Sequence, residues 1–134
     1  MGHLDKITKD FGIPVEWIID SKIFYDFTKR INLNKVSIKK EYVSLKNINK
    51  KLKKGFLITY IDGFYLWEKD YGLYFKYHFP HFIIILSKTE EKYRIIDPND
   101  GIIKEVNEKV LLRGIKSLKR HLWMSPMIIR FNQK

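Results

Sequence analysis

The segment from His81 to Asp97 constrains the fold more than any other part of the chain. The apolar run Phe82–Leu86 is followed by a polar turn and then by a second apolar run, Tyr93–Ile96. Two short apolar runs separated by a few polar residues predict an antiparallel β-hairpin. The segment Asp97–Gly101 is rich in turn-forming residues, so the second strand should end there. A fold that contains this hairpin has to build a sheet around it.

The rest of the chain combines helical and strand patterns. Apolar residues at helical spacing predict four helices, and continuous or alternating apolar residues predict further strands. The expected helices cover residues 4–11, 22–31, 45–54 and 108–122, and the expected further strands cover residues 15–19, 34–38, 56–61, 102–106 and 126–131. In the second helix, Ile23, Phe24, Phe27 and Ile31 share one apolar face, which is the face expected to be buried. We expect an α+β fold, with N-terminal helices packed on an antiparallel sheet of four or five strands.

The composition fits one globular domain. The 134 residues are 45% hydrophobic and 15% aromatic, so they can bury a core, and we expect a single domain over residues 1–134. No run approaches the roughly 18 apolar residues of a membrane span, and the N-terminus lacks a signal-peptide pattern. We therefore expect a cytoplasmic protein without a membrane span. The absence of cysteine excludes disulfides, thiolate metal sites and thiol catalysis within these residues.

His81 and Asp97 form the candidate catalytic pair. His81 precedes one strand of the predicted hairpin and Asp97 ends the other, so antiparallel pairing brings the two side chains to the same end of the hairpin. A carboxylate bonded to one ring nitrogen fixes the tautomer of an imidazole and stabilises the imidazolium. An alternative is that His81 is an ordinary loop residue and that Asp97 serves only its turn.

The same part of the chain resembles the papain-like cysteine peptidase fold. The resemblance rests on Lys54–Asp62, Phe64–Leu66, His81–Leu86 and Tyr93–Pro98. These segments are similar to the bacteriocin-leader peptidase domains of ABC exporters. They are more similar to the N-terminal domain of butirosin biosynthesis protein H and its relatives. Those proteins share a helix–Gly–strand–Asp segment followed by a His-strand-hairpin-Asp-Pro element. The resemblance implies a peptidase or acyltransferase-like domain of natural-product biosynthesis or peptide processing.

In that family a cysteine at the start of the first helix is the nucleophile. The corresponding position falls at or just before Met1, and no cysteine is present. Three explanations are open: a fragment whose nucleophile lies upstream, a natural pseudoenzyme, or a different alignment of the first helix. As the chain stands, we expect it to act by binding rather than by catalysis. The aromatic loop Phe64–Pro80 should pack over the sheet and line a cleft. The candidate substrate-binding residues are Asp62, just before this loop, and Tyr65, Trp67 and His78 within it.

Basic residues suggest the partners. The chain has a net charge of +11, which favours anionic partners, although a lysine-rich composition alone would produce the same excess. One helix carries a candidate basic partner surface, made of Lys46, Lys50, Lys51, Lys53 and Lys54. The resemblance implies an acidic acyl carrier protein or a peptide as its partner. A second hypothesis is a basic binding module for nucleic acid or an acidic carrier protein. His78 and His81 lack an obvious third ligand, so we expect no metal and no cofactor.

Overall fold

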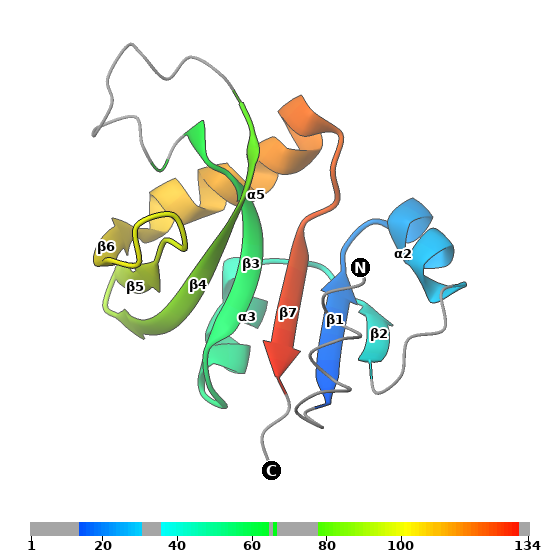
Figure 1. Cartoon of the computed structure of the whole chain (residues 1–134), viewed down its shortest axis with the longest axis horizontal. Helices are drawn as coiled ribbons and strands as arrows, with labels where there is room; N and C mark the ends of the chain where they lie inside the picture. The colour runs from blue at the N-terminus through cyan, green and yellow to red at the C-terminus, as the bar shows by residue number, and fades with distance from the viewer. Residues whose placement is uncertain (1–13, 31–35, 65, 67–77, 132–134) are drawn as a thin grey trace.

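The apolar segments form one large sheet (Figure 1). A computed structural model of the chain describes residues 14–30, 36–64, 66 and 78–131. Within these residues the sheet has seven strands in the order β2-β1-β7-β3-β4-β5-β6. The strands are β1 Val15–Ile19, β2 Val36–Lys40, β3 Leu57–Asp62, β4 Pro80–Thr89, β5 Lys92–Ile96, β6 Ile103–Asn107 and β7 Met127–Phe131. β1 and β2 are parallel, and every other neighbouring pair is antiparallel.

Three helices of eight or more residues accompany the sheet in the described part of the chain. They are α2 Lys22–Lys29, α3 Leu45–Leu52 and α5 Glu108–Leu122. The Ser44 side chain caps α3 by accepting a hydrogen bond from the Asn47 amide, and Asn107 caps α5 by accepting one from the Lys109 amide. α5 ends at Trp123, which adopts a left-handed backbone conformation with φ 56°. None of these helices has both the length and the apolar composition that crossing a bilayer requires.

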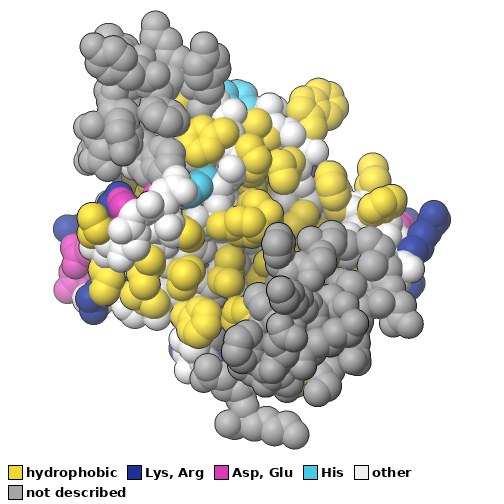
Figure 2. Space-filling model, in the orientation of Figure 1, with side chains coloured by type: hydrophobic (Ala, Val, Ile, Leu, Met, Phe, Trp, Pro, Cys, Tyr) yellow, Lys and Arg dark blue, Asp and Glu magenta, His cyan; other side chains and the backbone are white. Residues whose placement is uncertain are grey.

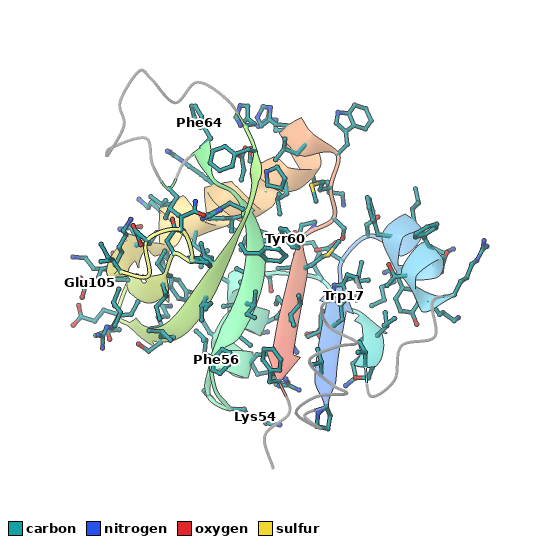
Figure 3. The ribbon with its side chains drawn as sticks, viewed as in Figure 1. Trp17, Lys54, Phe56, Tyr60, Phe64 and Glu105 are labelled. Carbon is teal, nitrogen blue, oxygen red and sulfur yellow. The ribbon has the colours of Figure 1, made fainter. Side chains whose placement is uncertain are left out.

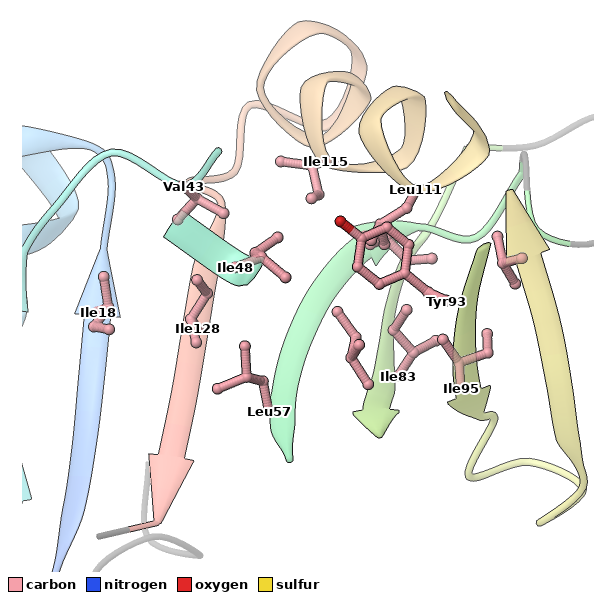
Figure 4. Packing of buried hydrophobic residues seen from close by; sticks show 13 residues of the cluster. Ile18, Val43, Ile48, Leu57, Ile83, Tyr93, Ile95, Leu111, Ile115 and Ile128 are labelled. Carbon is pink, nitrogen blue, oxygen red and sulfur yellow. The ribbon is translucent and has the colours of Figure 1, made fainter. Parts of the chain in front are cut away.

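α3 and α5 cover the same face of the sheet. Ile48 of α3 and Leu111, Ile115 and Leu118 of α5 belong to one buried cluster with sheet residues such as Leu57. Figure 4 shows the side chains of both helices directed at the strands from the same side. Burial of aliphatic side chains on this scale is the main stabilising contribution of the fold, since each fully buried side chain contributes about 1.5–3 kcal/mol. We call α3 and α5 together the helical layer.

The opposite face of the sheet carries a second cluster. It is centred on Val15, Trp17 and Met127, and Phe24 and Tyr25 of α2 pack against it. α2 lies beside the edge strand β2 and its neighbour β1, so it covers only the border of this face. Because of that position, one side of its apolar stripe is left in solvent. The prediction that Ile23 and Phe27 are buried is wrong: they are 80% and 66% exposed.

The mixed α+β class and the central hairpin are confirmed, but the predicted arrangement needs correction. Two strands, β1 and β2, precede α3 in the chain, and the helices that cover the main core come from its middle and its end. The sheet has seven strands rather than four or five, because the short outer segments all pair into one sheet. The expected first helix, residues 4–11, lies outside the described residues.

A buried ion-paired network holds the border strands together. Glu16 of β1 is 3% exposed, and its Oε2 atom lies 3.1 Å from Lys39 Nζ of β2 and 3.1 Å from an Arg130 guanidinium nitrogen of β7. Burial acts to raise the pKa of Glu16, but the two cations outweigh it and the pKa lies below its ordinary value of 4.5. One carboxylate therefore connects three neighbouring strands.

We predict that Glu16→Gln lowers the free energy of unfolding at neutral pH by about 1–3 kcal/mol, because two charge-assisted hydrogen bonds are lost. The folded-state pKa is depressed, so this contribution is present above pH 4.5 and is lost as the pH falls through the folded-state pKa. Urea unfolding of both proteins between neutral and acidic pH measures the difference. As a control, Glu105→Gln should change stability by less than about 0.5 kcal/mol, since its pair with Lys92 is exposed. A pH-independent difference for Glu16→Gln would contradict the prediction.

Candidate functional site

The start of β4 lies between the ends of β3 and β5. In the β3–β4 register, Asp62 is opposite Pro80 and Ile61 is opposite His81. On the other side of β4, Ile96 at the end of β5 is opposite Ile84. Asp62 and Asp97 therefore flank the first residues of β4, one on each side, at the end of the sheet where Phe64 is labelled in Figure 3.

His81 and Asp97 are in contact at this end. His81 Nε2 lies 2.8 Å from Asp97 Oδ1, and the two side chains are 10% and 0% exposed. This confirms the predicted hydrogen bond between the two residues. A neutral ring must carry its proton on Nε2 to donate to the carboxylate, so the contact selects one tautomer.

A β-bulge in β4 places His81 and Asp97 on the same face of the sheet. The β4–β5 register shifts by one residue between Ile85 and Ser87. Near the turn, Ser87 is opposite Arg94. If that register continued along the hairpin, Asp97 would be opposite Ile84, and the two side chains of the pair would lie on different faces of the sheet. After the bulge Ile85 is opposite Ile95, so Asp97 and His81 share the face that is covered by the helical layer.

Asp97 also organises the turn that follows it. Its Oδ1 accepts a hydrogen bond from the Asn99 amide at 3.0 Å, and its carbonyl accepts one from the Gly101 amide at 2.8 Å. Asp97 is therefore both a turn residue and the partner of His81. The turn fixes the backbone of Asp97, and this limits the positions that its carboxylate can take relative to His81.

Asp62 forms a second carboxylate–histidine contact on the other side of β4. It is fully buried, and its Oδ2 lies 2.5 Å from His78 Nδ1 and 2.6 Å from Ser117 Oγ. Its Oδ1 accepts hydrogen bonds from the backbone amides of Phe64 and Phe79, at 3.0 and 3.2 Å. A carboxylate with four donors is well compensated for its burial. Asp62 therefore ties together the end of β3, the approach to β4 and α5.

Two residues of this contact network were not singled out as its members from the sequence. Ser117 binds Asp62, and His121 stacks on His78 with ring centroids 4.1 Å apart and planes 7° apart. Their spacing of four residues on α5 places them on one helical face, which is the only sequence signal that points to them.

Gly63 allows the close approach of the neighbouring segment. A Cβ atom at Gly63 would lie 2.5 Å from the Phe79 ring and 3.2 Å from His81 Cβ. A side chain here would therefore have to displace the Phe79 ring and press against His81, so glycine suits this position. The backbone of Gly63 also donates a hydrogen bond to the Phe79 carbonyl at 2.9 Å.

The predicted cleft falls largely outside the described residues. Tyr65 and Trp67 lie outside the described residues, as does most of the loop that was expected to cover a cleft. Two hollows of about 390 and 380 Å³ occur in the described part of the chain, one at the β4–β5 turn and one beside α3, and neither is lined by His81 or Asp97.

The predicted basic surface is reduced by one member. Lys46, Lys50, Lys53 and Lys54 are exposed on α3 or just after it. Lys51 is not part of this surface, because its side chain is 12% exposed and its Nζ lies 3.1 Å from Glu41. Lys54 lies at the end of the sheet opposite to Phe64 and the carboxylate–histidine contacts (Figure 3).

We predict that Asp62→Asn lowers the free energy of unfolding by about 1–3 kcal/mol. An amide whose NH₂ group takes the place of Oδ1 faces two backbone N–H donors, Phe64 and Phe79. In the other orientation the amide keeps those bonds but loses the negative charge that strengthens the contacts with His78 and Ser117. Ser117→Ala removes only one donor and should cost less, about 1 kcal/mol. Urea unfolding followed by tryptophan fluorescence gives both values. Asp62→Asn with wild-type stability would contradict the bonding described for Asp62.

Comparison with known proteins identifies no relative. No family model, curated protein or solved structure matches this chain.

Proposed function

We propose that His81 and Asp97 are the proton-transfer pair of a papain-like acyl-transfer or peptide-processing site. The observation that carries the proposal is the buried 2.8 Å contact between His81 Nε2 and Asp97 Oδ1 at the end of the β4–β5 hairpin. Asp97 is fully buried, so its charge is balanced by specific hydrogen bonds rather than by water. A histidine held in this way is suited to accept and return a proton.

The division of roles between the two ring nitrogens follows from the contact. Nε2 is bonded to Asp97, so Nδ1 is the atom that exchanges a proton with a reacting group. When Nδ1 takes up a proton, the imidazolium is stabilised by the carboxylate. The 134 residues contain no cysteine, so the proposal assigns this chain the proton-transfer pair and the binding of substrate, and not a thiol nucleophile.

The resemblance to papain-like proteins supplies the class of substrate. The proposed substrate is an acyl group in thioester linkage, delivered by a carrier protein, or a peptide. A thiol that attacks a thioester loses its proton to His81 Nδ1 as the new carbon–sulfur bond forms. The departing sulfur receives that proton as the old carbon–sulfur bond breaks, so the histidine is regenerated.

An added thiol can replace the missing nucleophile in a direct test. We predict that the protein accelerates exchange between an acyl-pantetheine thioester and a small free thiol by about tenfold or more over buffer, because positioned general bases contribute at least that much. His81→Gln should reduce the rate to that of buffer, and Asp97→Asn should give an intermediate rate. The measurement is the rate of formation of the new thioester by chromatography.

Lys22→Gln is the control, because it removes an exposed titratable side chain from α2, which packs beside β1 and β2. It should exchange at the wild-type rate. If His81→Gln and the wild type were equally fast, or if neither exceeded buffer, the proposed proton-transfer role of His81 would be refuted.

A further inference from the structure

The net positive charge of the chain is concentrated in one layer of the molecule. α3 with the two residues after it carries five lysines and no acidic residue, and α5 carries five Lys or Arg residues and one acid, Glu108. The positive and negative charges of the rest of the chain almost cancel, since it has sixteen Lys and Arg residues and fourteen Asp and Glu residues. A general bias towards lysine would scatter the excess over the whole chain. The concentration instead marks the outer side of the helical layer as a surface for an anionic partner.

The cations of α5 form a regular stripe. Lys109, Arg113, Lys116 and Arg120 follow one another at steps of four, three and four residues, which places them on one face of the helix. All four are exposed, as is the neighbouring Lys119. None of the five forms an ion pair with another part of the described chain. At 1.5 Å per residue the stripe is about 16 Å long.

The other side of the sheet has a different character. Figure 2 shows it with hydrophobic side chains over its centre and with the coloured Lys and Arg side chains at its borders. α3 and α5 pack on the face turned away from this view. The exposed lysines of α3 and the stripe on α5 therefore belong to the same helical layer. The described part of the chain therefore has one strongly basic side.

An exposed aromatic residue follows the end of α5. Trp123, the C-cap residue, comes three residues after Arg120 and is 86% exposed. A large apolar ring left in water next to a row of cations is suited to stack on a nucleobase, whereas the cations bind the phosphates. Arg113 and Arg120 can also bind phosphate oxygens through two N–H groups at once.

We propose that the helical layer binds a single strand of nucleic acid, with successive phosphates along the α5 stripe and a base stacked on Trp123. The length of the stripe matches about five nucleotides at the 3.4 Å rise of one strand. An acidic protein is the less fitting partner, because the stripe offers one aromatic ring, Trp123, beside five cations, whereas a protein interface buries a central cluster of apolar anchors. The outward positions of α5 between Lys109 and Arg120 are all occupied by cations.

Fluorescence anisotropy with a labelled single-stranded oligonucleotide tests the proposal. Five phosphate contacts predict that log K falls with log salt with a slope of about −3.5. Arg113→Gln/Lys116→Gln should weaken binding about tenfold or more at 100 mM salt and reduce the slope to about −2. Trp123→Ala should weaken binding to the single strand about fivefold or more and leave binding to a duplex of the same sequence unchanged.

The matched control is Lys22→Gln/Lys40→Gln, which removes the same charge from exposed positions on α2 and β2. It should bind within twofold of the wild type. Circular dichroism and melting temperature establish that each variant is folded, and glutamine is well tolerated at exposed helical positions. An equal loss of affinity for the oligonucleotide in Arg113→Gln/Lys116→Gln and in Lys22→Gln/Lys40→Gln would overturn the proposal. An unchanged affinity of Trp123→Ala for the single strand would also overturn it. Tighter binding of polyglutamate than of the oligonucleotide would also overturn it, in favour of an acidic protein partner.

Discussion

Two buried carboxylates determine the structure at one end of the sheet. Asp62 ends β3, Asp97 follows β5, and both are fully buried on either side of the start of β4. A buried carboxylate is strongly destabilising unless hydrogen bonds compensate it. The segment that opens β4 supplies a histidine to each, His78 to Asp62 and His81 to Asp97, and backbone amides complete the bonding. The conformation of this segment is therefore tied to both neighbouring strands.

The sequence predicted the contact between His81 and Asp97 but not the feature that permits it. Turn residues and two apolar runs were sufficient to place both side chains at the same end of a hairpin. Side chains alternate between faces along a strand, so the exact register decides whether two residues can meet. The bulge between Ile85 and Ser87 changes that register by one residue. No residue in this stretch marks a bulge, because Leu86 fits a regular strand equally well.

Other errors have a common cause, which is that local patterns do not specify what lies next to a segment. The apolar spacing in α2 was read correctly as helical, but Ile23 and Phe27 are exposed because α2 sits at the border of the sheet. Asp62 was predicted as a substrate-binding residue, and its contact with Ser117, 55 positions away in the chain, was not predicted. The lysines of α3 were predicted to form a basic surface, and the structure adds the cations of α5 to it, because both helices pack on the same face of the sheet.

The central claim is that Asp97 holds His81 in one tautomer through Nε2. Long-range ¹H–¹⁵N correlation spectra of the imidazole rings, recorded with Asp97→Asn as the reference for assignment, test it most directly. For the neutral ring, we expect a proton on Nε2 of His81 that exchanges slowly with water, since the two side chains are 10% and 0% exposed. A neutral ring with its proton on Nδ1, or a ring proton that exchanges as fast as that of an exposed histidine, would contradict it.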